Sequence, residues 1–453
     1  MLVMPQLREG TSVVFVSDSH IGGDPGCDGF ESPDELRSLF DELSSRDGPV
    51  ELILAGDFFD FLQIGRVPEG MNRASLTISR PEYRELFSSL REFREKEGNR
   101  VVYLPGNHDA ESFWNSDIQE TLKEQGMVDE FAYCYLATLE TSEGRRTIYC
   151  EHGNQLDPAN TVEDYGDPLD TPLGHHVVTD FTRRVAPFGE VSRGLDLSEI
   201  KMVYSLVAIP AWVSGRYFYA LVGKLVGYLL LPLLAAYVVY RITAYSLVLA
   251  SGGRGFLGAP RELPRIHLVF LDLTIFGLLL LIVTGVFFLV IRRAVRRTAA
   301  TLSPGSQPRY SPAEASQREI RTILKGGKKP PMNLSLDPAQ MDVFVSGHTH
   351  LPSLEKVENG RGEPSVLANS GCWLRQLQPV SPHLKGPPVF VAKFVLTYVV
   401  VSAGEAGLNV ELWEHPKPAR QRLSRIERLI SWGRIPEQPP LGSTPTVRAR
   451  ATV

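Results

Sequence analysis

The 453-residue sequence predicts an α/β fold in which buried strands present polar side chains at one edge of a sheet. Two observations predict it. Five short apolar runs have the length and the β-branched and aromatic content of buried strands, and each is followed within a few residues by aspartate, asparagine or histidine. The runs cover residues 13–16, 52–55, 101–104, 147–150 and 343–345. Because the carboxyl ends of strands in an open α/β sheet point at one crevice, we expect these polar side chains to converge.

The polar residues form five motifs, in the same order as the runs. These motifs are Asp18-Ser19-His20, Gly56-Asp57-Phe58-Phe59-Asp60, Gly106-Asn107-His108-Asp109, Glu151-His152-Gly153 and Gly347-His348-Thr349-His350. Their carboxylate, amide and imidazole groups suit Mn, Fe or Zn, whereas a thiolate-rich site would favour Zn or Cu. Two cations ~4 Å apart also need a bridging carboxylate, and Asp57 is the candidate bridge. Gly56, Gly106 and Gly347 are expected to permit tight turns, because glycine adopts positive φ without a Cβ clash.

In this order the motifs resemble the calcineurin-like metallophosphoesterase superfamily. The resemblance implies a two-sheet α/β/β/α sandwich and a phosphoric ester hydrolase that uses a hydroxide held between two divalent metal ions. Manganese is the expected metal, with iron or zinc as alternatives. The resemblance extends over roughly residues 11–153 and 336–415, and it implies two closing strands near 389–401 and 409–413.

Residue by residue, the resemblance assigns metal ligands and catalytic residues. One metal would take Asp18, His20, Asp57 and His350, and the other would take Asp57, Asn107, His152 and His348. His108 would protonate the leaving oxygen or stabilise its developing charge, and Asp109 would orient the His108 imidazole.

Three further polar residues lie close to these motifs. Asp60 is interpreted as a residue that supports the ligands rather than one that only shapes a turn. Asn154 is the candidate substrate-binding residue, although Asn154 and Asp157 fit equally well as residues that shape a turn. The five histidines outside the motifs have no assigned chemistry.

Length and composition limit the domain organisation and the partners. A chain of 453 residues exceeds a typical single domain, and almost two hundred residues separate the last two motifs. We therefore expect a core of 11–153 and 336–415, a helical insertion at 154–335, and an amphipathic helix with a disordered tail at 416–453. The formal charge of −5 gives no case for nucleic acid as a partner, and the oligomeric state stays open. Four cysteines lack metal-binding or redox spacing.

The insertion contains two apolar segments long enough to cross a membrane. Residues 273–291 are nineteen uncharged residues, about 28 Å as a helix, and residues 217–240 are apolar apart from one lysine. His152 precedes both segments and His348 follows both, so the number of crossings must be even, which predicts a hairpin. Positive charges are more frequent at its outer ends, which places the catalytic core in the cytoplasm. The alternative is a pair of apolar helices buried in a soluble cap or a dimer interface.

The Gly-Asp-Phe-Phe-Asp-Phe segment at 56–61 and the membrane insertion resemble the UDP-diacylglucosamine pyrophosphohydrolase branch, which cleaves a lipid-linked diphosphate. That branch typically has arginine where this chain has His108, and His108 restores the pattern of general phosphoesterases. Three functions remain open. The first is an enzyme of the inner or plasma membrane that hydrolyses a lipid-linked phosphate or diphosphate. The second is a membrane-anchored phosphatase or phosphodiesterase acting on soluble nucleotides or phosphoproteins, and the third is a catalytically silent membrane scaffold.

Overall fold

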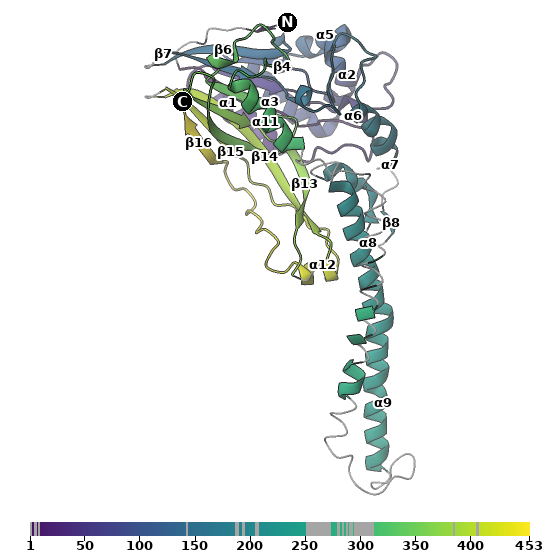
Figure 1. The fold of residues 1–453 in the computed structure, drawn as a ribbon. Helices are drawn as coiled ribbons and strands as arrows, with labels where there is room; N and C mark the ends of the chain where they lie inside the picture. The colour runs from purple at the N-terminus through teal and green to yellow at the C-terminus, as the bar shows by residue number, and fades with distance from the viewer. Residues whose placement is uncertain are drawn as a thin grey trace.

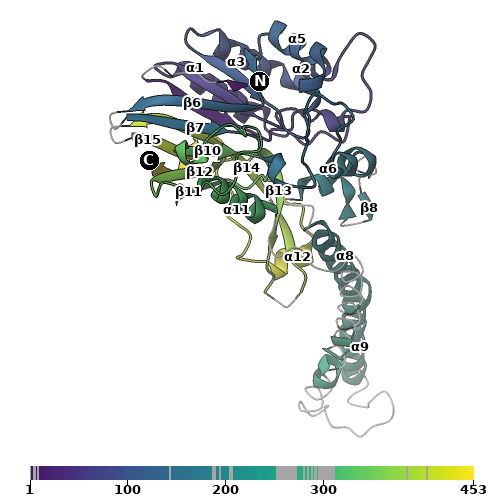
Figure 2. The same cartoon turned by 45° about the horizontal axis from the view of Figure 1, so that its top comes forward.

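The computed structural model contains two sheets that face each other, with helices on the outer face of each (Figures 1 and 2). The predicted α/β fold with two sheets is therefore confirmed. The structure describes residues 10–141, 144–185, 190–192, 195–203, 208–250, 273–278, 312–383, 386–404 and 407–453, together with positions 2, 3, 7 and a few between 281 and 293.

The larger sheet has eight strands within the described ranges. Their order is β16 (Thr446–Thr452), β15 (Gly407–Glu414), β14 (Val389–Gly404), β2 (Ser12–Val16), β3 (Val50–Ala55), β4 (Arg100–Leu104) and β5 (Glu130–Phe131), and β13 (Trp373–Val380) pairs with the first half of β14. Strands β2, β3 and β4 are parallel neighbours, so their carboxyl ends lie at the same edge.

The smaller sheet has six strands in the same part of the chain. Their order is β1 (Leu2–Val3), β6 (Cys134–Thr141), β7 (Gly144–Cys150), β10 (Val343–Ser346), β12 (Pro364–Asn369) and β11 (Ser353–Glu358). Strands β7, β10 and β12 are parallel. All five apolar runs of the sequence thus form strands, as predicted, and each of these strands runs parallel to at least one neighbour.

The sequences of these strands are continuous apolar runs because both faces of each strand are buried. In β2, Val13 and Phe15 belong to the core between the two sheets, whereas Val14 and Val16 pack under the helices of the larger sheet. The helices that cover this sheet are α1 (Pro33–Ser45), α2 (Arg73–Ile78), α3 (Arg84–Glu95) and α5 (Ser116–Glu124), and α4 (Glu111–Trp114) lies beside α5. On the smaller sheet, α11 (Pro312–Leu324) buries Ile320 and Ile323.

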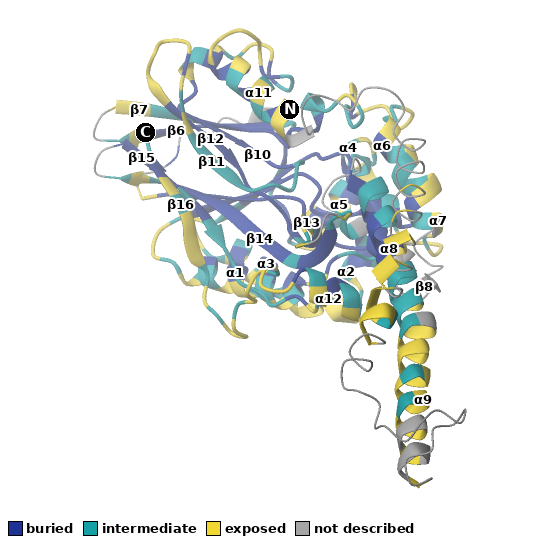
Figure 3. Cartoon of the chain, turned by 60° about the horizontal axis from the view of Figure 1, so that its bottom comes forward, coloured by how far each residue is buried: buried dark blue, intermediate teal, exposed yellow. Residues whose placement is uncertain are grey.

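A long apolar helix extends away from the sheets (Figure 1). It comprises α8 (Ile209–Leu225), a π-helical turn (Val226–Leu230) and α9 (Leu231–Ala250). The π-helical turn ends two residues before Pro232, which has no N–H to donate to the helix. Residues Ile209–Thr243 have the length and composition to cross a membrane, with mean hydropathy 1.9 and no part of the apolar window buried, and no second such helix lies within the described residues. The exposed surface of α9 is visible in Figure 3.

Most of the second apolar segment, 273–291, and its connection to α9 lie outside the described residues. The described part, residues 273–278, is helical. Phe276 stacks on Tyr237 of α9, with 4.2 Å between ring centroids. The hairpin as a whole stays a prediction.

The C-terminal region differs from the expectation of a disordered tail. The two closing strands are confirmed as β14 and β15, but the tail expected to be disordered forms β16, antiparallel to β15. This prediction was wrong because Ala451 and Val453 fill the end of the core between the sheets, which the polar, proline-rich sequence before them conceals. Before β16, the short α12 (Arg425–Ile430) turns Ile426 and Ile430 toward α8 and leaves Leu429 exposed.

The insertion begins with several short elements between the sheets and the long helix. They are α6 (Leu173–His176), a π-helical turn (Val177–Thr182), α7 (Arg183–Val185), β8 (Glu190–Ser192), β9 (Leu195–Asp196) and a 3-10 helix (Leu197–Met202). Val203, just after the 3-10 helix, forms a bridge with Leu377 of β13, which attaches this part of the insertion to the larger sheet.

Candidate metal centre

Both sheets contribute loops to the candidate centre. Asp18, Asp57 and Asn107 follow β2, β3 and β4 of the larger sheet, whereas His152 and His348 follow β7 and β10 of the smaller sheet. Backbone bonds join neighbouring loops: the amide of Asp18 donates to the carbonyl of Gly56 (3.1 Å), and that of Gly347 donates to the carbonyl of His152 (2.8 Å). The structure thus brings together residues that are more than three hundred positions apart.

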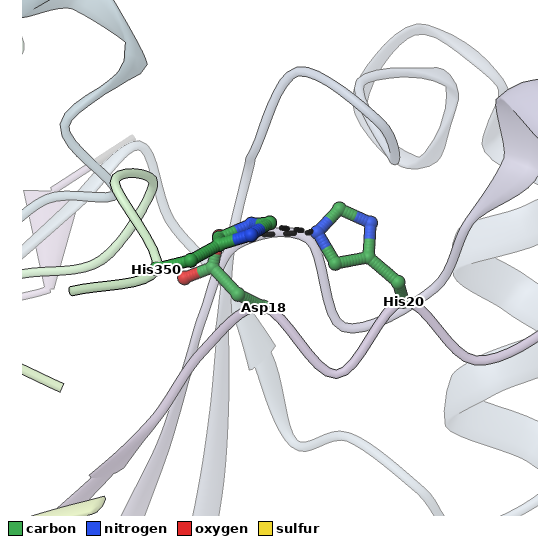
Figure 4. A group of neighbouring side chains, drawn as sticks. All are labelled: Asp18, His20 and His350. Carbon is green, nitrogen blue, oxygen red and sulfur yellow. Dashed lines mark hydrogen bonds and ion pairs between the residues drawn. The ribbon is translucent and has the colours of Figure 1, made fainter. Parts of the chain in front are cut away.

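Asp18, His20 and His350 form the first group of candidate ligands, and their side chains point toward one another (Figure 4). Nε2 of His350 lies 3.1 Å from Oδ1 of Asp18 and 3.1 Å from Nε2 of His20. Ligand atoms bound to one ion by bonds of ~2 Å are separated by about 3 Å, so this group matches the geometry of a metal site.

Asp57, His152 and His348 form the second group. Oδ2 of Asp57 lies 3.3 Å from Nε2 of His152 and 3.8 Å from Nε2 of His20, which belongs to the first group. Asp57, the candidate bridge, therefore lies close to candidate ligands of both groups.

Buried polar atoms of the candidate ligands that lack a hydrogen-bond partner indicate that the centre binds cations. Asp18 Oδ1, Asn107 Oδ1 and His152 Nε2 are buried and have no hydrogen-bond partner among the described residues. Leaving a buried polar atom unpaired costs about 1–3 kcal/mol. The Nδ1 atom of His152 lies 2.8 Å from the carbonyl of Ala55, which leaves Nε2 as the nitrogen available to a metal. Carboxylate, amide and imidazole donors with free lone pairs fit divalent metal ions.

The backbone at the candidate ligands is unusual. Within the described residues, five residues other than glycine have positive φ, and all five are candidate ligands: Asp18, His20, Asp57, His348 and His350. Each such conformation costs of order 1 kcal/mol or more, and strain of this kind concentrates at functional sites. The turns after β2, β3 and β10 therefore use strained backbone to aim these side chains into one space.

Positive φ was expected to explain the three motif glycines, but it explains only one of them. Gly56 has positive φ (83°), as predicted, but neither Gly106 nor Gly347 does. At these two positions glycine is required by close approach: a Cβ at Gly106 would overlap the Asp57 side chain, and one at Gly347 would overlap the Asp18 side chain. The loops after β4 and β10 can therefore reach the carboxylates only without side chains at these positions.

His108, the candidate proton donor, is held by Asp60. Its Nδ1 atom lies 2.9 Å from Oδ1 of Asp60, and its backbone amide donates to Asp57 Oδ1 (2.7 Å). The expectation that Asp109 orients this ring is corrected. The fully buried Asp109 carboxylate accepts hydrogen bonds from Tyr103 Oη (2.6 Å) and from the amides of Phe58 (2.9 Å) and Gly106 (2.7 Å), so it braces the loops after β3 and β4.

The charges around His108 keep it protonated. Burial acts to lower the pKa of this imidazole, but the carboxylates of Asp60 and Asp57 outweigh burial and raise it to about 9. For Asp60, burial acts to raise the pKa, and His108 outweighs it and lowers the pKa to about 2. Burial, reinforced by Asp57, raises the pKa of Asp109 to about 7. Asp60, which is not among the predicted metal ligands, thus favours the protonated form of His108 that a general acid requires.

Of the two candidates in the loop after His152, Asp157 lines the pocket and Asn154 does not. Asn154, the candidate substrate-binding residue, is 1% exposed and uses its amide within the loop, where it donates to Asn160 O (2.9 Å) and accepts from Tyr165 Oη (3.0 Å). This arrangement favours the turn-shaping alternative for Asn154. Asp157 instead lines the pocket, with Oδ2 3.2 Å from Nε2 of His348.

One pocket is lined by members of both groups of candidate ligands. Its lining includes the candidate ligands His20, Asp57, Asn107, His348 and His350, together with His108 and Asp60. Seven apolar residues, most of them in the insertion, also line the pocket and form its apolar wall: Val178, Ile200, Met202, Val203, Ile209, Leu351 and Leu374. Ile200, Met202, Val203 and Ile209 belong to an apolar stretch that is too short to span a membrane, which predicts an interfacial or pocket-lining helix. Val178, Leu351 and Leu374 were not predicted as part of the site, because nothing in their local sequence distinguishes pocket-lining from core residues.

The comparison with known families agrees with this geometry. Residues 11–197 match the family described as calcineurin-like phosphoesterase. This match supports the calcineurin-like phosphoesterase superfamily for this part of the chain, and with the groups of candidate ligands it supports a metal-dependent phosphoric ester hydrolase. No curated protein matches the chain closely enough to serve as a relative.

Proposed function

We propose that this chain is a membrane-associated phosphoesterase with a dinuclear metal centre, and that its substrate is an amphiphilic phosphate ester or diphosphate. The pocket carries this proposal, because its lining combines metal-ligand candidates with apolar side chains of the insertion. An alkyl or acyl chain would leave water against the apolar side chains while its phosphate meets the candidate ligands.

The position of Asp57 between two groups of ligands supports two cations rather than one. Two divalent ions, manganese or else iron or zinc, would neutralise charge on the phosphoryl oxygens and lower the pKa of the attacking water. The protein itself supplies the proton for the leaving oxygen from His108. Asp60 holds the His108 ring, which lines the pocket, through Nδ1 and leaves the other ring nitrogen as the candidate proton donor.

Two features support membrane association. Exposed apolar side chains such as Leu233, Val239 and Ile242 cover α9 on a helix long enough to span a bilayer. His152 and His348 lie on either side of this helix in the sequence, yet their rings are 5.3 Å apart. A chain that leaves the core and returns to it crosses a membrane an even number of times, so we propose a hairpin in which the 273–291 segment returns beside α9, with the core in the cytoplasm.

The substrate proposal is tested with a series of compounds that share one phosphate head group and differ in alkyl chain length. Assayed with added manganese beside nucleotides and a phosphopeptide, kcat/KM is expected to rise with chain length. A preference for nucleotides or the phosphopeptide at every concentration would defeat the amphiphile proposal. No hydrolysis of any compound, including a generic aryl phosphate and a phosphodiester, would favour a catalytically silent scaffold.

A matched pair of variants tests the role of the apolar wall. Val178 and Val177 are neighbours in one π-helical turn and are both half-buried, but only Val178 lines the pocket. Val178→Asn is expected to lower kcat/KM for long-chain compounds and to leave short-chain compounds unaffected. Val177→Asn serves as the control and is expected to leave both unchanged.

Extraction of membranes with alkaline carbonate tests the hairpin. A spanning protein stays in the membrane pellet and requires detergent for release. Recovery of the full chain in the soluble fraction as a defined oligomer would instead favour an apolar dimer interface or cap.

A further inference from the structure

Arg375 is the single arginine or lysine among the described residues that line the pocket. It lies on β13, opposite Phe394 of β14. The next residue, Gln376, donates from Nε2 to the carbonyl of His350 (3.0 Å), which ties this strand to the loop of a candidate metal ligand. Arg375 therefore faces the same space as the metal centre without belonging to it.

The guanidinium of Arg375 is buried with only part of its hydrogen-bonding capacity used. The residue is 7% exposed. Its Nη2 atom lies 3.0 Å from Glu31 Oε1 and 3.0 Å from the sulfur of Met202, and its Nε atom is buried without a partner among the described residues. A guanidinium has five N–H donors, and burying its charge is costly unless the donors are paired. The Glu31 side chain is 40% exposed, so its charge is largely screened by water. The guanidinium of Arg375 therefore has donors and charge available to bind a second anion besides Glu31.

The position of Arg375 identifies which part of a substrate would reach it. Met202, in contact with Nη2, belongs to the apolar wall together with Ile200 and Val203. Arg375 thus contacts the apolar wall, while the next residue on its strand, Gln376, contacts the loop of the candidate ligand His350. In an amphiphile bound with its reacting phosphate at the metal centre, this is the place of the remaining head group.

We infer that Arg375 binds a second phosphate of the substrate, the one that is not attacked, and so favours diphosphates over monophosphates. Arginine suits this role because its planar fork donates two parallel hydrogen bonds to phosphate oxygens. The inference rests on the proposed function and adds to it the class of head group. The competing explanation is purely structural: Arg375 would only hold Met202 and the start of the insertion against β13.

Kinetics on an alkyl monophosphate and the alkyl diphosphate of equal chain length separate these explanations. For Arg375→Met, kcat/KM for the diphosphate is expected to fall about tenfold to hundredfold, mainly through KM, because a charge-assisted contact is lost. The monophosphate should change by less than about threefold, within the context dependence of a single contact. Arg375→Lys should recover part of the loss, since it keeps the charge without the fork.

Two further variants serve as controls. Glu31→Gln removes the competing carboxylate and is expected to lower KM for the diphosphate. Arg321→Met removes another arginine that pairs with a glutamate, Glu355, away from the pocket, and should affect neither substrate. Equal losses on both substrates in Arg375→Met, or no loss on either, would overturn the inference.

A binding measurement keeps the inference testable if turnover is absent. Calorimetric titration of the full chain with methylenediphosphonate, which resists hydrolysis, is made in the presence of manganese. The inference expects weaker binding to Arg375→Met than to the unmodified chain, and equal affinities contradict it. If the diphosphonate binds through Arg375 but no phosphate compound is hydrolysed, the proposed function fails while the anion site stands.

Discussion

Nδ1 of His108, in the loop after β4, lies 2.9 Å from Oδ1 of Asp60, in the loop after β3. The carboxylate that directly follows His108 in the sequence, Asp109, is turned away and hydrogen-bonds to Tyr103. The orientation and charge of the candidate proton donor are thus set by a neighbouring strand. This relationship distinguishes the two aspartates experimentally.

Replacing Asp60 with asparagine is expected to alter the pH dependence of activity. Because burial alone would lower the pKa of His108 and Asp60 helps to raise it to about 9, the variant should have a lower His108 pKa. A general acid loses activity as the pH rises through its pKa, so the alkaline limb of the kcat/KM profile should move to lower pH by about one unit or more. An alkaline limb that does not move would contradict the assignment.

Asp109→Asn is the matched comparison for Asp60→Asn. Asp109 accepts bonds on both oxygens, and an amide would place N–H groups against one set of donors. We expect a lower melting temperature with the alkaline limb of the activity profile in its original place. Thermal unfolding and a pH series on the same preparation would show both effects.

Asp57→Asn and His108→Ala should both nearly abolish turnover, for different reasons. Asparagine at position 57 lacks the charge to hold two cations, so elemental analysis should find less bound metal. His108→Ala removes only the proton donor, so the metal content should stay unchanged. Both variants should keep the melting behaviour of a folded protein, and full activity in either would remove the role assigned to that residue.

Gly106→Ala is expected to reduce the metal content of the protein, although it adds only one methyl group. The added methyl group would overlap the Asp57 side chain and displace the candidate bridge. Gly227→Ala is the control, because a Cβ there meets nothing within 4 Å. Metal content and activity should fall together in Gly106→Ala and remain unchanged in Gly227→Ala. Equal metal content in both variants would show that the close approach at Gly106 is not required.

Glu151→Gln is expected to change how stability depends on pH. Glu151 is fully buried, where it accepts a hydrogen bond from Tyr149 Oη (2.6 Å), and burial raises its pKa from 4.5 to about 7. A carboxyl group whose folded pKa exceeds its unfolded value binds its proton more tightly in the folded state. Stability is therefore lost as the pH rises from about 4.5 to about 7, by an amount on the order of 2 kcal/mol.

The glutamine variant cannot ionise, so this decline should shrink. Urea unfolding at pH 5 and pH 7.5, in detergent and with chelator present, would measure the difference in free energy of unfolding. A decline as large as that of the unmodified chain would show that Glu151 does not ionise in this range.

Much of the fold followed from local pattern. The apolar runs at β2, β3, β4, β7 and β10 are strands buried on both faces, and such strands need no partner information to be recognised. The polar motifs could be recognised as candidate ligands because each one follows such a strand within a few residues. β16 was missed because its contribution to the core, Ala451 and Val453, is small and follows a proline-rich segment.

The sequence by itself determined which residues are candidate ligands, since the residue types that follow each strand are those that bind divalent metal ions. Only the tertiary structure decided which carboxylate meets His108, which glycines allow loops to close on Asp57 and Asp18, and that Arg375 faces the pocket. These relationships join residues on different strands and on the insertion. They depend on strand order and on how the insertion packs against β13, and these are long-range contacts that no local periodicity encodes.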